Sequence, residues 1–308
     1  MPTDTPLDVA PLEVHTSPAG IGWRRVASRV SLPFLMGGGG TLIVAYLSII
    51  VLLPIAALIS HGLSISVAGR GAGLEFWRWH VSTNFSLFWE SITAPGAESA
   101  IFLSLWLSFA VAALNAVMGV AIAWVLVRDK FFGRTFIDSV IDLPFALPTI
   151  VAGVVLLAIY GPDSPIHIDL FETWMGLMLA LLFVTLPFSV RAVQPVLASL
   201  DLESEDAART LGAGGVRTFF GVVMPSLWPS VLAGFGLAFA RAIGEFGSIS
   251  LIAGGVPRTT TASYYVFNLT AGFEWSAAAA VSVALLVLSL VVLVTANVVS
   301  HRYQKRLL

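Results

Sequence analysis

Long apolar stretches recur along the chain, separated by short segments that are richer in charged residues, glycine and proline. A helix that crosses about 30 Å of hydrocarbon needs roughly 20 mostly apolar residues. Six stretches meet that requirement: Gly37–Ser60, Ala100–Val127, Phe136–Tyr160, Trp174–Val196, Ser226–Ala253 and Ala277–Ser300. The pattern therefore predicts an all-α integral membrane protein with six transmembrane helices.

Two of the predicted spans contain residues that interrupt a regular membrane helix. The third begins with two aspartates and two prolines and the fourth contains a proline and an arginine, which are Asp138, Asp142, Pro144, Pro148, Pro187 and Arg191. Such interruptions are tolerated where neighbouring helices or a water-filled cavity satisfy the freed backbone groups. We expect both spans to be broken helices, with the two aspartates capping the third span or meeting Arg134.

The basic residues are distributed unequally between the connecting segments. If the N-terminus is inside, the inner segments contain most of the 16 Lys and Arg residues, whereas the outer loops contain Arg70, Arg78 and Arg258. Short cytoplasmic loops are enriched in Lys and Arg. The distribution therefore predicts that both termini lie in the cytoplasm.

The segments at the two ends of the chain differ in composition from the six spans. Residues 1–36 combine proline, threonine and acidic residues with a later arginine cluster, which predicts a disordered or interfacial cytoplasmic tail. Residues 37–300 form the predicted transmembrane permease domain, and residues 301–308 form a short basic cytoplasmic tail. We interpret the first span as an uncleaved signal-anchor, because its apolar run exceeds the about 7–15 residues of a signal peptide.

Composition agrees with a lipid environment and excludes several classes of function. Apolar residues make up 57% of the chain and charged residues 11%, compared with about 45–50% and about 25% in soluble domains. The net charge of -2 gives no electrostatic basis for binding nucleic acid. The chain has no cysteine, which excludes disulfides, thiolate catalysis and Cys-ligated metals.

Known catalytic and nucleotide-binding motifs are missing from the sequence. Neither of the two lysines, Lys130 and Lys305, completes a G-x-x-x-x-G-K-[ST] phosphate-binding loop. The sequence also lacks a G-x-S-x-G elbow and an H-E-x-x-H helix, and its five histidines are scattered. We therefore predict that this chain is not an enzyme and binds no metal or cofactor itself.

The longest inner loop, residues 201–225, combines an acidic start with small residues. Its first positions carry four acidic side chains, which favour a helix N-terminus through the helix dipole. We expect this helix to continue to Leu211 and to end at Gly212. Val216–Met224 is then predicted to form a second short helix before Pro225 opens the fifth span. The resulting elbow suits the docking of another protein, and an ordinary acidic interfacial loop is the alternative.

The same loop resembles the EAA motif of ABC-importer permeases, E-A-A-x3-G-x9-I-x-L-P. The spacing is intact, with Asp in place of Glu, Val in place of Ile and Met in place of Leu. The matching positions are Asp206, Ala207, Ala208, Gly212, Val222, Met224 and Pro225. In that family the loop is the coupling helix, which sits in a groove of a cytoplasmic ATPase. The resemblance implies that these residues, together with Glu205, couple the chain to an ATPase.

A resemblance to the sulfate/thiosulfate permeases extends over three further segments, residues 142–153, 186–195 and 238–247. Within that family the segments resemble the T-subunit (CysT-like) type rather than the W-subunit type. The resemblance implies a type I ABC importer-like permease of the inner membrane that transports sulfate or thiosulfate. It also implies its partners: two copies of a cytoplasmic ATPase that use ATP and Mg, a paralogous W-type permease and an extracytoplasmic sulfate-binding protein.

Other classes of transporter stay open at this point. Molybdate permeases share the loop motif, so a molybdate or tungstate permease is one alternative. A proton-coupled secondary anion transporter is another, although such folds usually show two related halves and no repeat relates the first three predicted spans to the last three. A membrane-embedded enzyme is a third, and it lacks a catalytic constellation.

Two charged residues fall inside the fifth predicted span. Arg241 and Glu245 lie four residues apart, so on one helix they would share a face and could pair. An unpaired charge in mid-membrane costs at least about 2.5–3.5 kcal/mol, so the pair must face protein or water. It either lines the translocation path of an anion, possible further contacts being Ser248 and Thr149, or only fixes helix packing. Most Ser and Thr residues in membrane helices bond their own backbone.

Overall fold

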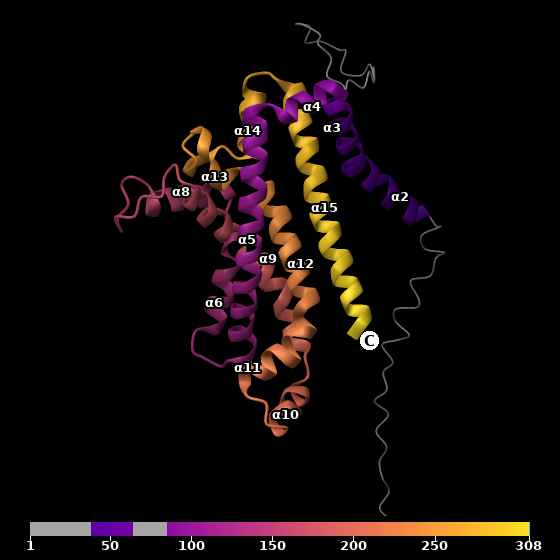
Figure 1. Ribbon diagram of the computed structural model, residues 1–308, viewed down its shortest axis with the longest axis vertical. Coiled ribbons are helices and arrows are strands. Elements are labelled where there is room, and N and C mark those ends of the chain that lie inside the picture. Colours follow the sequence, from indigo (N-terminus) through magenta and orange to yellow (C-terminus); the bar gives the residue numbers. More distant parts are fainter. Residues whose placement is uncertain (1–37, 64–84, 308) are drawn as a thin grey trace, which may run out of the picture. The chain divides into compact units, whose positions relative to one another are not determined.

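The computed structural model of the chain describes residues 38–63 and 85–307, and it separates the chain into two compact units, residues 1–55 and 56–308. The secondary structure of the described residues is helical throughout (Figure 1). This confirms the predicted all-α class. The predicted tail at 1–36 lies outside the described residues, as does the loop that contains Arg70 and Arg78.

Five helical segments in the described part of the chain are long and apolar enough to cross a membrane: Leu42–Ser60, Pro95–Arg128, Trp174–Ser199, Gly215–Ile243 and Trp275–Ser300. The first comprises parts of α2 (Gly38–Leu47) and α3 (Leu53–Leu63) with a π-helical turn between them, η2 (Ser48–Leu52). The second, third and fifth are α5 (Pro95–Arg128), α9 (Trp174–Ser199) and α15 (Trp275–Leu307). The fourth joins α11 (Gly215–Thr218), the π-helical turn η4 (Phe219–Val223) and α12 (Met224–Ile243). The side of the membrane that each end faces stays a prediction from the charge distribution.

The predicted third span is not one helix, so the expected count of six spanning helices is not reached among the described residues. Residues 134–160 form three short helices, α6 (Arg134–Ile141), α7 (Leu143–Ala146) and α8 (Thr149–Tyr160). Leu147 is extended, with ψ 133°, between α7 and α8. The residue before a proline is disfavoured in the helical region, so Pro148 accounts for this second break.

The fourth predicted span was expected to be interrupted, and this expectation was wrong. α9 is continuous through Pro187 and Pro195. Its inner face packs into a cluster with α5 and α12 that includes Val120, Val193 and Leu227. Burial against two neighbouring helices holds α9 in a helical path despite the backbone hydrogen bonds that the prolines remove.

Three helices of the second unit approach each other closely around Ser189 of α9. A Cβ added to Gly119 of α5 would lie 2.8 Å from the Cβ of Ser189, and one added to Gly234 of α12 would lie 3.2 Å from its Cα. Small residues allow membrane helices to pack with their backbones in contact. Gly119 and Gly234 therefore allow α5 and α12 to lie against the backbone of α9 at Ser189.

The predicted fifth span, Ser226–Ala253, is wrong at both ends. The helix begins earlier, because α11 and η4 run directly into α12, so Val216–Met224 is not a separate second helix. The helix also ends earlier, at Ile243, and a new helix, α13 (Gly247–Ile252), starts after a break at 244–246. The sequence between Val216 and Val223 contains no helix breaker except Gly221, whereas Gly244 and Gly247 flank the later break.

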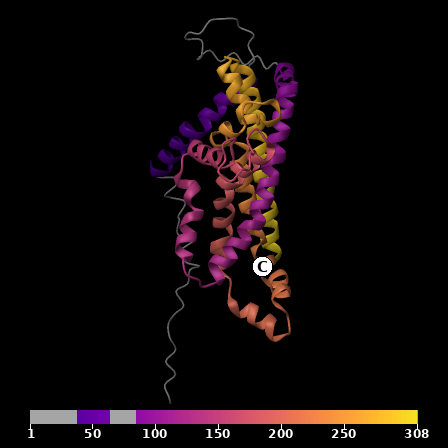
Figure 2. The ribbon, with the colours of Figure 1, turned by 90° about the vertical axis from the view of Figure 1, so that its left-hand side faces the viewer.

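The remaining elements are short and lie between the long helices. They are α4 (Phe85–Thr93), α10 (Leu202–Thr210), the 3-10 turn η5 (Pro257–Thr259) and α14 (Ala262–Ala271). Figures 1 and 2 show α10 and α11 together at one end of the second unit, beyond the adjoining ends of α5 and α9. Of the predicted elbow at 201–225, α10 and α11 project in this way, whereas 219–225 belong to the long helix; the name elbow is kept for residues 201–218.

Candidate coupling and translocation sites

Specific backbone caps fix both ends of α10. At its start, the Asp201 carboxylate accepts the backbone N–H of Glu203 at 3.0 Å. At its end, the N–H of Gly212 donates to the carbonyl of Arg209 at 2.9 Å, and the N–H of Ala213 donates to the carbonyl of Ala208 at 3.0 Å. With Gly212 at φ 83°, these two bonds form a Schellman motif. The motif explains the fixed interval between Ala208 and Gly212, and it confirms the predicted glycine stop.

The tip of the elbow presents apolar and small residues to its surroundings. Leu211 is 89% exposed and Val216 75% exposed. Because α10 ends at Thr210, Leu211 lies one residue beyond the helix that it was predicted to continue. A Cβ added to Gly214 or Gly215 would meet no atom within 4 Å, and neither glycine has a positive φ. Neither internal packing nor backbone conformation therefore requires glycine at these two positions.

The residues that the sequence assigned to coupling fall into three groups by exposure. Those that are exposed are Asp206, Ala207 and Gly212; those that are partly buried are Ala208, Val222, Met224 and Pro225; and Glu205 is buried. Asp206 pairs with Arg209 on the same helix at 2.9 Å, and both side chains are more than half exposed. The acid at the motif position therefore remains accessible at the surface.

Glu205 points in the opposite direction from its neighbour Asp206. Its side chain is 3% exposed and its carboxylate lies 2.6 Å from the guanidinium of Arg128, the last residue of α5. A second arginine, Arg209, lies 3.5 Å away. The contact with Arg128, which is 77 residues distant in the chain, was not predicted from the sequence. Its one detectable signal was a basic residue in the last turn of a long apolar helix.

Arg241 and Glu245 do form an ion pair, as predicted, but they do not share a helix. Arg241 lies in the last turn of α12, where a cation favours the helix dipole, and Glu245 lies in the break that follows. Glu245 Oε1 accepts the N–H of Ser248 at 2.9 Å and its hydroxyl at 3.1 Å, while Oε2 faces Arg241. The carboxylate therefore ties the end of α12 to the start of α13. Arg241 is 32% exposed and Glu245 only 1%.

The other two residues assigned to the path lie where α8 and α13 meet. A Cβ added to Gly247 would lie 2.2 Å from Oγ1 of Thr149, and one added to Gly153 would lie 2.8 Å from the carbonyl oxygen of Ser248. Thr149 is partly buried and Ser248 is fully buried. Of the four residues assigned to the path, Arg241 is therefore the charged one that reaches the surface of this chain.

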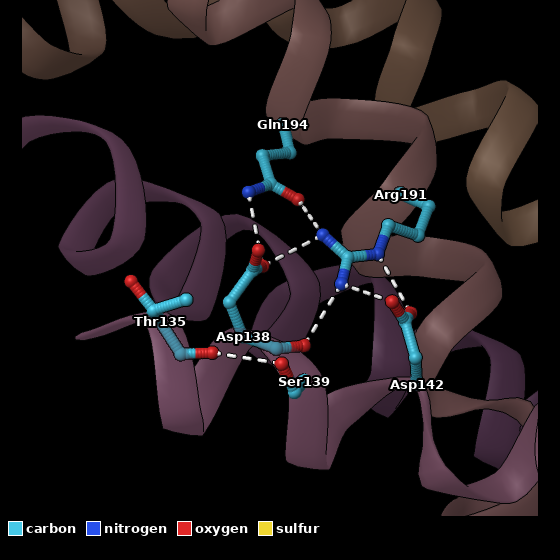
Figure 3. Close-up of polar contacts among 6 residues, drawn as sticks. All are labelled: Thr135, Asp138, Ser139, Asp142, Arg191 and Gln194. Atoms are coloured by element: carbon cyan, nitrogen blue, oxygen red, sulfur yellow. Dashed lines mark hydrogen bonds and ion pairs between the residues drawn. The ribbon is translucent and has the colours of Figure 1, made fainter. Parts of the chain in front are cut away.

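A larger polar network connects the broken third segment to α9 (Figure 3). Arg191 donates from Nε and Nη2 to the two carboxylate oxygens of Asp142, at 2.8 and 2.6 Å, and from Nη1 to Asp138 at 2.7 Å. Gln194 joins Asp138 and Arg191. Neither aspartate side chain caps a helix, and Arg134 acts on Asp138 through its charge without forming an ion pair with either aspartate. The partner is the arginine of the next long helix, which tertiary packing brings alongside.

The charges of this network do not suit an anion site. Two aspartates surround one arginine, so the network carries a net charge of about -1 when all three groups are ionised. Every nitrogen of the Arg191 guanidinium already donates to an oxygen of the protein. The network therefore holds α6 and α9 together.

Solved structures show which class of membrane protein has this architecture. A bacterial ABC transporter involved in the import of the acidic polysaccharide alginate superposes with a TM-score of 0.69 at 16% identity, covering 90% of this chain and 99% of that chain. The MetNI methionine ABC transporter superposes with a TM-score of 0.52 at 13% identity, covering 68% and 99%. The fold is that of the membrane subunits of ABC importers.

Sequence comparison identifies the family. Residues 115–305 match the family described as the binding-protein-dependent transport system inner membrane component. The sulfate transport system permease protein CysT of Salmonella typhimurium is 35% identical, over 91% of this chain and 98% of the relative. The CysT protein of Escherichia coli is 36% identical over the same shares of the two chains. The CysT protein of Synechococcus elongatus is 39% identical, over 83% of this chain and 88% of the relative. The chain therefore belongs to this family, as a multi-pass inner-membrane permease subunit that is not the catalytic component.

Proposed function

We propose that the chain is one transmembrane half of an ABC importer for sulfate or thiosulfate. The observation that carries this proposal is that relatives at 35–39% identity, matched over most of this chain, are all named sulfate transport permeases. The other half of the pathway is a paralogous W-type permease. An extracytoplasmic sulfate-binding protein delivers the anion, and the permease itself makes and breaks no covalent bond.

The elbow is the docking site for a cytoplasmic ATPase, of which the complete importer contains two copies that use ATP and Mg. The freedom of Gly214 and Gly215 from internal constraint supports this role, because glycine at such positions allows another backbone to approach closely. The exposed side chains of Leu211 and Val216 supply apolar area to the same contact. Closure of the ATPases on ATP presses the elbow and turns the spans outward, and hydrolysis resets them.

Arg241 is the contact of this chain with the passing dianion. Its guanidinium is partly exposed, while its partner Glu245 is held in place by Ser248. A fixed carboxylate at the back of the arginine reduces its net attraction for an anion, and conduction requires that a bound ion also leaves. Thr149 and Ser248 support this site from the contact between α8 and α13.

The test is reconstitution of this chain with its second permease, its ATPase and its binding protein in proteoliposomes. ATP hydrolysis is measured with sulfate, thiosulfate, molybdate or tungstate as the ligand of the binding protein. We expect stimulation by sulfate or thiosulfate of several-fold over the basal rate. Stimulation by molybdate or tungstate alone would assign the alternative cargo, and anion uptake by this chain without an ATPase would identify a secondary transporter.

A further inference from the structure

Glu205 is a buried carboxylate on a helix whose other residues are almost all exposed. Its side chain is 3% exposed, whereas Glu203 and Asp206 on the same helix lie at the surface. Removing a carboxylate from water costs several kcal/mol unless a charged partner compensates. Arg128, 2.6 Å away and 14% exposed, is that partner. Because it is buried, Glu205 is unavailable to a docked ATPase, in contrast to the role that its place beside the motif implied.

The partner of Glu205 belongs to a third helix that is remote from the elbow in sequence. Arg128 ends α5 and lies 5.9 Å from the ring of Trp124, one turn earlier. Trp124 in turn meets Phe219 of η4 edge to face, with ring centroids 5.2 Å apart. One cluster of side chains therefore connects α10, the end of α5 and the start of the helix that continues into α12.

Among the described residues, the ion pair with Arg128 is the one polar side-chain contact that α10 makes with a different helix. No other side chain of α10 forms a hydrogen bond or ion pair to a different helix in that part of the protein. α10 also packs against α11 and η4, which continue into α12, and it is joined to the bundle by residues 200–201 and 211–214. An irregular connection transmits a push less well than a direct contact between helices, because its dihedral angles can change.

We propose that Glu205 is a positioning residue that transmits the movement of the elbow to α5 through Arg128. The proposal rests on the proposed function of the elbow as the part that receives the ATPase stroke. α5 packs against α9 and α12 along most of its length, through Leu107 and Val111 at one level and Val120 and Ala123 at another. A displacement of the end of α5 therefore carries α9 and α12 with it, because the three helices are packed together.

The experiment compares three variants with the unmodified complete importer in proteoliposomes. Glu205→Gln removes the charge that holds Arg128, Glu203→Gln makes the same change at an exposed position of α10, and the charge exchange Glu205→Arg with Arg128→Glu restores an opposite pair. The measured quantities are sulfate import, ATP hydrolysis and the amount of ATPase that co-purifies. For Glu205→Gln we expect unchanged co-purification and at least half of the ATP hydrolysis, with sulfate import about tenfold lower. Glu203→Gln should keep the unmodified ratio of sulfate import to ATP hydrolysis, and the exchange should recover most of the import.

A chemical link provides a second test that does not depend on the charge. The chain has no native cysteine, so Glu205→Cys with Arg128→Cys creates one unique pair of thiols. We expect this variant to hydrolyse ATP with little import until a short bis-maleimide joins the two positions, after which import recovers within the same preparation. A merely structural role for Glu205 would lower protein yield and ATP hydrolysis together, and would give no recovery after assembly.

The proposal is overturned if Glu205→Gln imports sulfate normally, or if linking positions 128 and 205 leaves import low. It is also overturned if Glu205→Gln loses the ATPase during purification, because Glu205 would then contact the ATPase itself. The proposed function fails by different observations, namely that the unmodified complex imports no sulfate or retains no ATPase.

Discussion

Replacing Arg191 by methionine tests whether its network holds the broken third segment against α9. The change removes two donations to Asp142, one to Asp138 and one to the backbone carbonyl of Asp138, while keeping a side chain of similar length. The three ionic side chains are 30–46% exposed, and exposed ion pairs contribute only about 0.2–1 kcal/mol each. A bidentate arginine is stronger than a simple pair, so the whole network contributes about 1–3 kcal/mol.

The assay is thermal unfolding of the purified permease in detergent. Arg191→Met should be the least stable form. Arg191→Lys should lose about half as much, because an ammonium cannot donate in parallel to both oxygens of Asp142. Adding Asp138→Asn and Asp142→Asn to Arg191→Met should recover stability, because no uncompensated carboxylate remains. Asp206→Asn is the control, since it removes only the exposed pair of Asp206 with Arg209. If Arg191→Met were as stable as this control, the network would contribute no more than a surface pair and the reasoning would be refuted.

Three further predictions concern glycines. Gly119→Ala places a Cβ 2.9 Å from the carbonyl carbon of Ser189 and should destabilise the bundle by about 1–3 kcal/mol. The control Gly221→Ala, with open space around the new Cβ, should not lower the unfolding temperature. Equal stability of the two variants would contradict the close packing of α5 on α9. At the elbow, Gly212→Asn should keep more import activity than Gly212→Val, because asparagine tolerates the positive φ that β-branched residues avoid. Gly215→Leu should instead fold normally and lose the co-purifying ATPase, and retention of the ATPase would exclude a close approach at that position.

The sequence alone predicted those features that depend on local composition. Apolar runs long enough for hydrocarbon placed α5, α9 and α15 to within a few residues, because a spanning helix satisfies its own backbone hydrogen bonds and needs only apolar side chains. The elbow was predictable for a similar reason. The cap at Asp201 and the glycine stop at Gly212 both lie within a few residues of the groups they satisfy.

Neighbouring helices decided where the long helices break. Proline was expected to interrupt α9 and did not, because α5 and α12 bury its inner face, whereas the segment before α8 does break at Leu147. The Arg241–Glu245 pair formed as predicted from the interval, but across a helix end that apolar periodicity did not reveal.

Only the tertiary structure decided which charged groups meet across the bundle. Arg191 with Asp138 and Asp142, and Arg128 with Glu205, join residues that are 49–77 positions apart. A charge on an apolar helix must find a partner inside the protein, so the sequence shows that partners exist. Which partner it finds depends on the helix that packs alongside, and local sequence carries no information about that neighbour. For this protein, composition and local spacing therefore determined the helices and the elbow, while packing determined how the elbow is held to the rest of the bundle.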